Sequence, residues 1–165
     1  HKKHKSTSFR SAKIPTWWII LLFYSDGLNV WNRNHLIMSN GTGLLGNPSS
    51  AQSAIIIPKP GSTTNYYIIT VPEAGSVGMR FSEIDMTLSG GLGAILPGNK
   101  NTLMFAPSSE KVAAVKHANG VYYWVVGREN GGSKKYVSFL RITGNNSLIS
   151  SSVPFLFSRR PGINT

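Results

Sequence analysis

Two acidic residues, Glu83 and Asp85, are the first candidates for chemistry in this sequence. Residues two positions apart on a β-strand point to the same face of the sheet, so the two carboxylates could act as an acid–base pair or bind a cation. Their alternation with the apolar residues Ile84 and Met86 favours a simpler interpretation, a solvated polar strand face. A metal site also gathers more ligands than two. We therefore keep Glu83 and Asp85 as weak candidates for ligand binding.

Trp31 and His35 form a second weak candidate for ligand binding, because exposed aromatic residues can stack on a sugar or a peptide. We expect His35 to close the turn that follows Trp31, and His117 to face Tyr122 across a hairpin. A catalytic triad or zinc site needs partners at set spacings, and the sequence contains neither G-x-S-x-G nor H-E-x-x-H. The histidines therefore give no indication of catalysis.

Residues 41–46, Gly-Thr-Gly-Leu-Leu-Gly, satisfy the G-x-G-x-x-G pattern of dinucleotide-binding proteins. That pattern works only when a helix follows at once and an acid lies about 20 residues further on. Here Asn-Pro-Ser-Ser follows, and the next acid is Glu73, so we predict a surface loop. The chain has no cysteine, which excludes thiolate zinc sites and cysteine nucleophiles. We expect no catalytic residue, no cofactor and no metal, and hence no enzyme.

The sequence predicts that the segments that position these residues are β-strands. Asp26-Gly27 and Asn119-Gly120 each separate two β-prone runs, as in tight hairpins with positive φ. A two-residue turn at Asn119-Gly120 would place Val115 opposite Trp124. The predicted strands cover residues 21–25, 28–32, 54–58, 66–71, 79–86, 112–118 and 121–126.

The predicted fold class is all-β and antiparallel, since no long window has a helical period free of Gly or Pro. Several strands, such as residues 122–126, are apolar throughout, which predicts sheets covered on both faces. A weak repeat aligns Tyr66 with Tyr122, and its spacing is close to that of propeller blades. About three such units fit, which predicts a partial β-propeller-like arrangement with an incomplete ring.

The positive charge lies mainly at the two ends. The chain has 165 residues and a net charge of +11, but residues 1–13 and 134–165 hold five bases each and no acid. Residues 14–133 hold seven bases and all six acids. Nonspecific, salt-sensitive adhesion to polyanions is expected from such ends, whereas a specific nucleic-acid site would interleave bases and aromatics on one surface. We expect no specific nucleic-acid partner.

The apolar run at residues 14–24 leaves two interpretations open. It follows a basic segment, as in a secretory signal, but no small-x-small cleavage site comes after it. Its 11 residues are also too few for a transmembrane helix, which needs about 20. A buried strand is the favoured interpretation, a signal-like segment is the alternative, and no transmembrane span is expected.

Four segments resemble a known family. They are residues 21–35 (LLFYSDGLNVWNRNH), 40–46 (NGTGLLG), 79–86 (MRFSEIDM) and 110–126 (EKVAAVKHANGVYYWVV). They are similar to the N-terminal propeller-like region of large secreted bacterial surface proteins, which often carry PKD-type repeats and a C-terminal sorting domain for gliding motility or type IX secretion. The resemblance covers about residues 21–143. It implies no catalytic residues.

The resemblance implies a propeller-like β domain at residues 21–143, flanked by a non-matching segment at 1–20 and a non-matching basic tail at 144–165. We hypothesise a fragment of a larger protein whose ends come from a truncated or frame-disturbed reading. The implied function is a secreted or cell-surface interaction scaffold for a protein or a glycan. The alternatives are polyanion binding through the basic ends and a cryptic glycan-active enzyme domain. Open strand edges also predict self-association.

Overall fold

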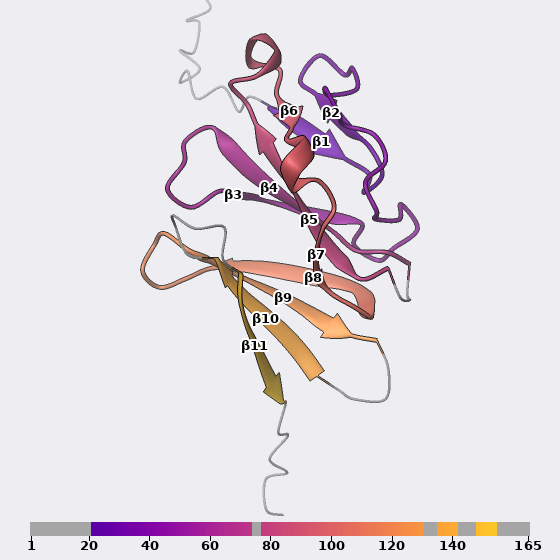
Figure 1. The fold of residues 1–165 in the computed structure, drawn as a ribbon, viewed down its shortest axis with the longest axis vertical. Helices are drawn as coiled ribbons and strands as arrows, with labels where there is room; N and C mark the ends of the chain where they lie inside the picture. The colour runs from indigo at the N-terminus through magenta and orange to yellow at the C-terminus, as the bar shows by residue number, and fades with distance from the viewer. Residues whose placement is uncertain (1–20, 74–76, 131–134, 142–147, 155–165) are drawn as a thin grey trace, which may run out of the picture.

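The computed structural model describes residues 21–73, 77–130, 135–141 and 148–154, and the side chains of those up to residue 130. Its named strands pair in antiparallel fashion, which confirms the predicted all-β antiparallel class. Figure 1 shows three successive parts along the long axis, with β1 and β2 at the top and β8–β11 at the bottom.

The strands form three sheets. The first pairs β1 (Phe23–Ser25) with β2 (Val30–Asn32). The second has the order β3-β4-β5-β6, with β7 also paired to β5, and the third has the order β11-β10-β9-β8. The bounds are β3 Ala54–Pro58, β4 Asn65–Thr70, β5 Met79–Asp85, β6 Ala94–Ile95, β7 Thr102–Phe105, β8 Ser108–Lys116, β9 Tyr123–Glu129, β10 Lys135–Arg141 and β11 Leu148–Pro154, with 3₁₀ turns η1 Ser89–Gly91 and η2 Pro97–Asn99.

The second sheet is covered on both faces. Ile69 and Phe81 belong to one buried apolar cluster, which also contains Val112 and Val125 of the third sheet. Ile68 belongs to the other cluster, which extends to β1, to β2 and to the loop around Leu44. Successive residues of a strand point to opposite faces, so the continuous apolar run in β4 fills both layers. This confirms the prediction of burial on both faces for the second sheet. For residues 122–126 of the third sheet it was wrong, since only Val125 is buried there and residues 113–116 of the neighbouring β8 are exposed.

Both hairpins form, but only the second has the predicted register. Val115 pairs with Trp124 as predicted, and Asn119 Oδ1 accepts hydrogen bonds from the following turn. In the first hairpin Ser25 pairs with Val30, so the loop has four residues and not two. The Asp26 carboxylate accepts hydrogen bonds from the backbone N–H groups of residues 28 and 29, which stabilises this wider loop.

Several predicted segments correspond closely to observed strands, and others lie outside the described residues. Residues 54–58 form β3 as predicted, while the apolar run at 14–24 is described only from residue 21 onward. β11 lies within the segment 144–165 and pairs along its length with β10. In the described part of the chain, no helix is long and apolar enough to cross a membrane.

Candidate functional site

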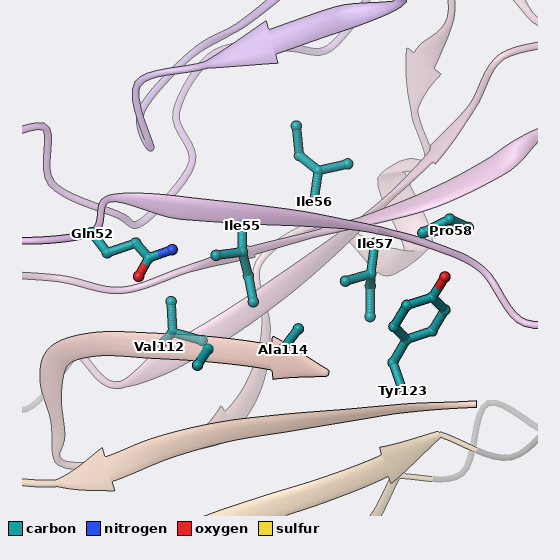
Figure 2. A pocket seen from close by; sticks show the side chains of 9 residues that line it. Gln52, Ile55, Ile56, Ile57, Pro58, Val112, Ala114 and Tyr123 are labelled. Atoms are coloured by element: carbon teal, nitrogen blue, oxygen red, sulfur yellow. The ribbon is translucent and has the colours of Figure 1, made fainter. Parts of the chain in front are cut away.

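An open groove lies between the second and third sheets. It has a volume of about 510 Å³ and runs between β3 and β8. Both strands lie at the edge of their sheets. Figure 2 shows Ile55 and Ile57 extending from β3 toward β8, while Val112 and Ala114 extend from β8 toward β3.

The floor of the groove belongs to the apolar layer between the two sheets. Ile57 and Val112 are buried in that layer, and Ile55 and Tyr123 pack against it. Tyr123 carries its hydroxyl to the end of the groove near Pro58, and Gln52 supplies an amide at the other end (Figure 2). The groove therefore has apolar walls with one polar group near each end, a combination typical of ligand pockets.

The second half of β8 forms an accessible wall of this groove. Residues 113–116 are exposed, although they still pair with β9. A strand at the edge of a sheet pairs on one side and leaves backbone groups on the other side free to pair with another chain. The groove therefore combines apolar contacts with an open strand edge.

Glu83 is not on a solvated face, so that part of the sequence interpretation is wrong. Its side chain is almost completely buried, and its carboxylate accepts hydrogen bonds from three donors on different segments. The donors are Lys59 Nζ at 2.6 Å, Asn65 Nδ2 at 3.0 Å and Asn99 Nδ2 at 2.8 Å. The alternation with apolar residues failed as a guide because the second sheet is covered on both faces.

The environment of Glu83 keeps its carboxylate ionised. Burial alone would raise its pKa, but the hydrogen bonds from Lys59 and Asn65, the Lys59 charge and the bond from Asn99 together hold the pKa below its usual value. A general acid needs a raised pKa and access to its substrate. Glu83 has neither, and its contacts tie β5 to the segments around residues 59, 65 and 99.

Asp85 has a separate, local role. Its Oδ1 accepts hydrogen bonds from the backbone N–H of Thr87 at 2.8 Å and from the Thr87 hydroxyl at 2.7 Å. These two bonds lower the pKa of Asp85. Since Glu83 and Asp85 use their oxygens on different partners, the structure does not bring them together as a carboxylate pair. Among the described residues, no group of three or more His, Asp or Glu side chains could hold a metal ion.

Trp31 and His35 do come together, through Tyr24. The rings of Tyr24 and Trp31 stack across the first hairpin with centroids 5.3 Å apart. The Tyr24 hydroxyl is hydrogen-bonded to His35 Nδ1 at 3.2 Å. His35 closes the turn as predicted, since its N–H donates to the carbonyl of Asn32, and it has a positive φ of 61°.

His117 faces Tyr122, as predicted, with ring centroids 6.2 Å apart. It also lies 5.8 Å from the ring of Trp124. The loop at residues 41–46 leads into a turn and then β3, with no helix after it. Leu44 of this loop is buried. Gly41 and Gly46 are tightly packed, since a Cβ at these positions would lie 2.7 and 2.5 Å from a backbone carbonyl oxygen.

Sequence reasoning did not identify the groove residues or Tyr24. The groove exists because two sheets pack face to face, and nothing in Ile55 or Ala114 alone signals that their strands lie at sheet edges. The two-residue turn predicted at Asp26-Gly27 would pair Tyr24 with Asn29, so the sequence contains no signal for the observed pairing of Tyr24 with Trp31. Searches of protein-family models, of curated proteins and of solved structures give no match to this chain.

Proposed function

We propose that this chain is a non-enzymatic interaction scaffold that binds an extended protein segment in the groove between β3 and β8. The observation that carries the proposal is the position of an apolar groove beside an open strand edge. An extended segment adding to the free edge of β8 gains backbone hydrogen bonds, and its alternate side chains enter the groove. Ile55, Ile57 and Tyr123 offer the apolar contacts.

A partial β-propeller-like arrangement is part of the same proposal. It is supported by two meanders of consecutive antiparallel strands that pack face to face. Their first strands, β3 and β8, lie against each other along the groove. In a propeller the blades are four-stranded sheets arranged around a central channel, so the groove corresponds to one segment of a channel wall. A secreted or cell-surface location, with type IX secretion, follows from the sequence resemblance alone.

The two alternative functions have less support. A glycan-active enzyme would need a carboxylic acid in a pocket, whereas Glu83 is sealed under three hydrogen-bond donors and Asp85 caps a turn. Polyanion binding through the ends involves residues 1–13 and 134–165; of their ten bases, only Lys135 and Arg141 lie in described segments, both in β10. No contact in the described part of the chain favours either alternative.

A pair of neighbouring alanines on β8 provides the test. Both line the groove. Ala114 points toward β3 (Figure 2), and because successive side chains of a strand point to opposite faces of the sheet, the Ala113 side chain points away from β3. Linear peptides are selected against the protein from a random display library, and their affinities are measured for the Ala114→Glu and Ala113→Glu variants. We expect selected peptides with apolar residues at alternate positions and an affinity loss of about tenfold or more in Ala114→Glu only.

Three outcomes would contradict the proposal. They are a failure to select any peptide, selected peptides without a period of two, and equal losses in both variants. Ala113 and Ala114 are both exposed, so neither variant should unfold the protein, and thermal unfolding of each serves as the folding control.

A further inference from the structure

The two hairpins of the chain carry clusters of the same three residue types. Tyr24, Trp31 and His35 form one cluster on the β1–β2 hairpin. Tyr122, Trp124 and His117 form the other at the end of the β8–β9 hairpin. These hairpins belong to the first and third sheets, at opposite ends of the stack (Figure 1). Both clusters lie outside the groove described above.

The Nδ1 atom of each histidine has a hydrogen-bond partner, but the two partners differ. The backbone N–H of Asn119 donates to His117 Nδ1 at 3.1 Å, which places the proton of the neutral ring on Nε2. His35 Nδ1 is occupied by the Tyr24 hydroxyl. Among the described residues, the Nε2 atom of neither histidine has a hydrogen-bond partner, so each cluster offers one polar ring atom beside two aromatic rings.

The rings are positioned in advance and remain accessible. Tyr24 is 36% exposed, His35 is exposed, and the other four side chains are half-buried. Their mutual contacts restrict the rotamers before a ligand arrives, which lowers the entropic cost of binding. The positive φ of His35 adds backbone strain at this site, and such strain is concentrated at functional positions.

We infer that the two His–Tyr–Trp clusters are binding sites for a polysaccharide. The face of an aromatic ring is electronegative and attracts the C–H groups on the flat side of a pyranose ring. The histidine Nε2 supplies the polar contact that orients a sugar hydroxyl. Two sites of the same design suit a ligand that repeats one chemical unit along its length, because both sites can then bind one chain with high avidity.

Charge favours a polysaccharide over a nucleic acid. Proteins that bind single-stranded nucleic acid combine stacking rings with a basic groove that follows the phosphates. In the described part of the chain, neither cluster includes a Lys or Arg in its ring or hydrogen-bond contacts. Nucleic acid is therefore an outcome that the experiment must separate from a polysaccharide.

The first measurement is retardation of the full chain in native gels that contain laminarin, hydroxyethyl cellulose, xylan or alginate, with single-stranded DNA as a separate arm. We expect retardation by at least one polysaccharide. Trp31→Ala and Trp124→Ala should each weaken it about tenfold or more, and the double variant should abolish it. His35→Asn and His117→Asn remove the imidazole ring with its Nε2 and leave both tryptophans in place. Asn tolerates the positive φ at position 35, so these variants test the histidines separately from the tryptophans.

Calorimetry with a hexasaccharide of the retarding polymer gives the number of sites. We expect two sites in the native chain and one in each single variant, with the remaining site unchanged. Leu103→Ala, at an exposed residue of β7, is the control and should retain both sites. The Ala114→Glu variant should also retain both, which separates this inference from the proposed groove function.

The inference is overturned if no polysaccharide retards the native chain, if the double variants bind as the native chain does, or if DNA binds more tightly through the same residues.

Discussion

Replacing Glu83 with Gln should destabilise the protein in a pH-dependent way. Gln has nearly the same shape as Glu, so packing is preserved while the charge is removed. All three partners of the Glu83 side chain, Lys59, Asn65 and Asn99, are hydrogen-bond donors. An amide can accept only through its single oxygen, so at least one partner must rotate or lose its bond.

The size of the effect follows from the type of hydrogen bond that is lost. Bonds to a charged group contribute about 1.5–3 kcal/mol and neutral ones about 0.5–1.5 kcal/mol, a difference of about 1 kcal/mol per bond. Three bonds would give about 3 kcal/mol. Lys59 is 29% exposed, so water compensates part of its lost contact. We expect Glu83→Gln to lower the free energy of unfolding by about 2 kcal/mol at pH 7.

The pH dependence has a definite sign. The pKa of Glu83 is lower in the folded protein than its usual value of 4.5, so the unfolded chain binds more protons in the window between the two pKa values. The stabilisation is complete above the unfolded pKa and is lost as the pH falls through the folded pKa. The gap between native chain and variant should therefore be constant near neutral pH and should shrink below the usual Glu pKa.

Urea denaturation followed by tryptophan fluorescence, repeated between pH 7 and pH 3, measures this gap. Other titrating groups, including Asp85, are present in both proteins and cancel in the difference. A variant as stable as the native chain at pH 7 would refute the buried network, and a gap that stays constant down to pH 3 would refute the assignment of its cause to the Glu83 charge.

Three shorter predictions concern other parts of the chain. Asp85→Asn should change the free energy of unfolding by no more than about 0.5 kcal/mol, because Asn keeps an oxygen that can accept from Thr87; a larger loss in urea denaturation would contradict this. Gly46→Ala should cost about 1–3 kcal/mol, because a Cβ at this position would lie 2.5 Å from the carbonyl oxygen of Gly27. Gly98→Ala, where nothing lies within 4 Å, is its control in the same assay. The free edges of β3 and β8 predict self-association at high concentration, and light scattering that shows only monomer would disprove it.

The strands themselves were predictable because local chemistry specifies them. β3 coincides with the predicted segment at residues 54–58, β4 is shifted by one residue from the predicted 66–71, and β5 ends one residue before the predicted 79–86. The continuous apolar run in β4 correctly indicated burial on both faces, as Ile68 and Ile69 show by packing into different clusters. β6 and β7 were not predicted because they are short, and β10 and β11 were not predicted either.

The sequence interpretation wrongly put Glu83 on a solvated strand face because its hydrogen-bond partners lie far away in the sequence. Lys59 is 24 residues before it and Asn99 is 16 residues after it. A buried carboxylate is stable only when such donors converge on it, and the alternation of polar and apolar residues contains no information about convergence. The groove was missed for a similar reason, since it depends on which strands end up at the edges of two packed sheets.

In the first hairpin, the sequence pattern specifies the sheet face on which Tyr24 lies but not its partner on the other strand. A two-residue loop at Asp26-Gly27 would pair Tyr24 with Asn29, whereas the observed four-residue loop pairs it with Trp31. The two registers differ by two residues, and because side chains alternate with a period of two, both place Tyr24 on the same face. The pattern therefore fixes the face on which an aromatic lies, but the partner depends on the loop, here on the two hydrogen bonds that Asp26 Oδ1 accepts. The Tyr24–Trp31 stack is thus a consequence of turn chemistry, and it brings His35 within reach of the Tyr24 hydroxyl.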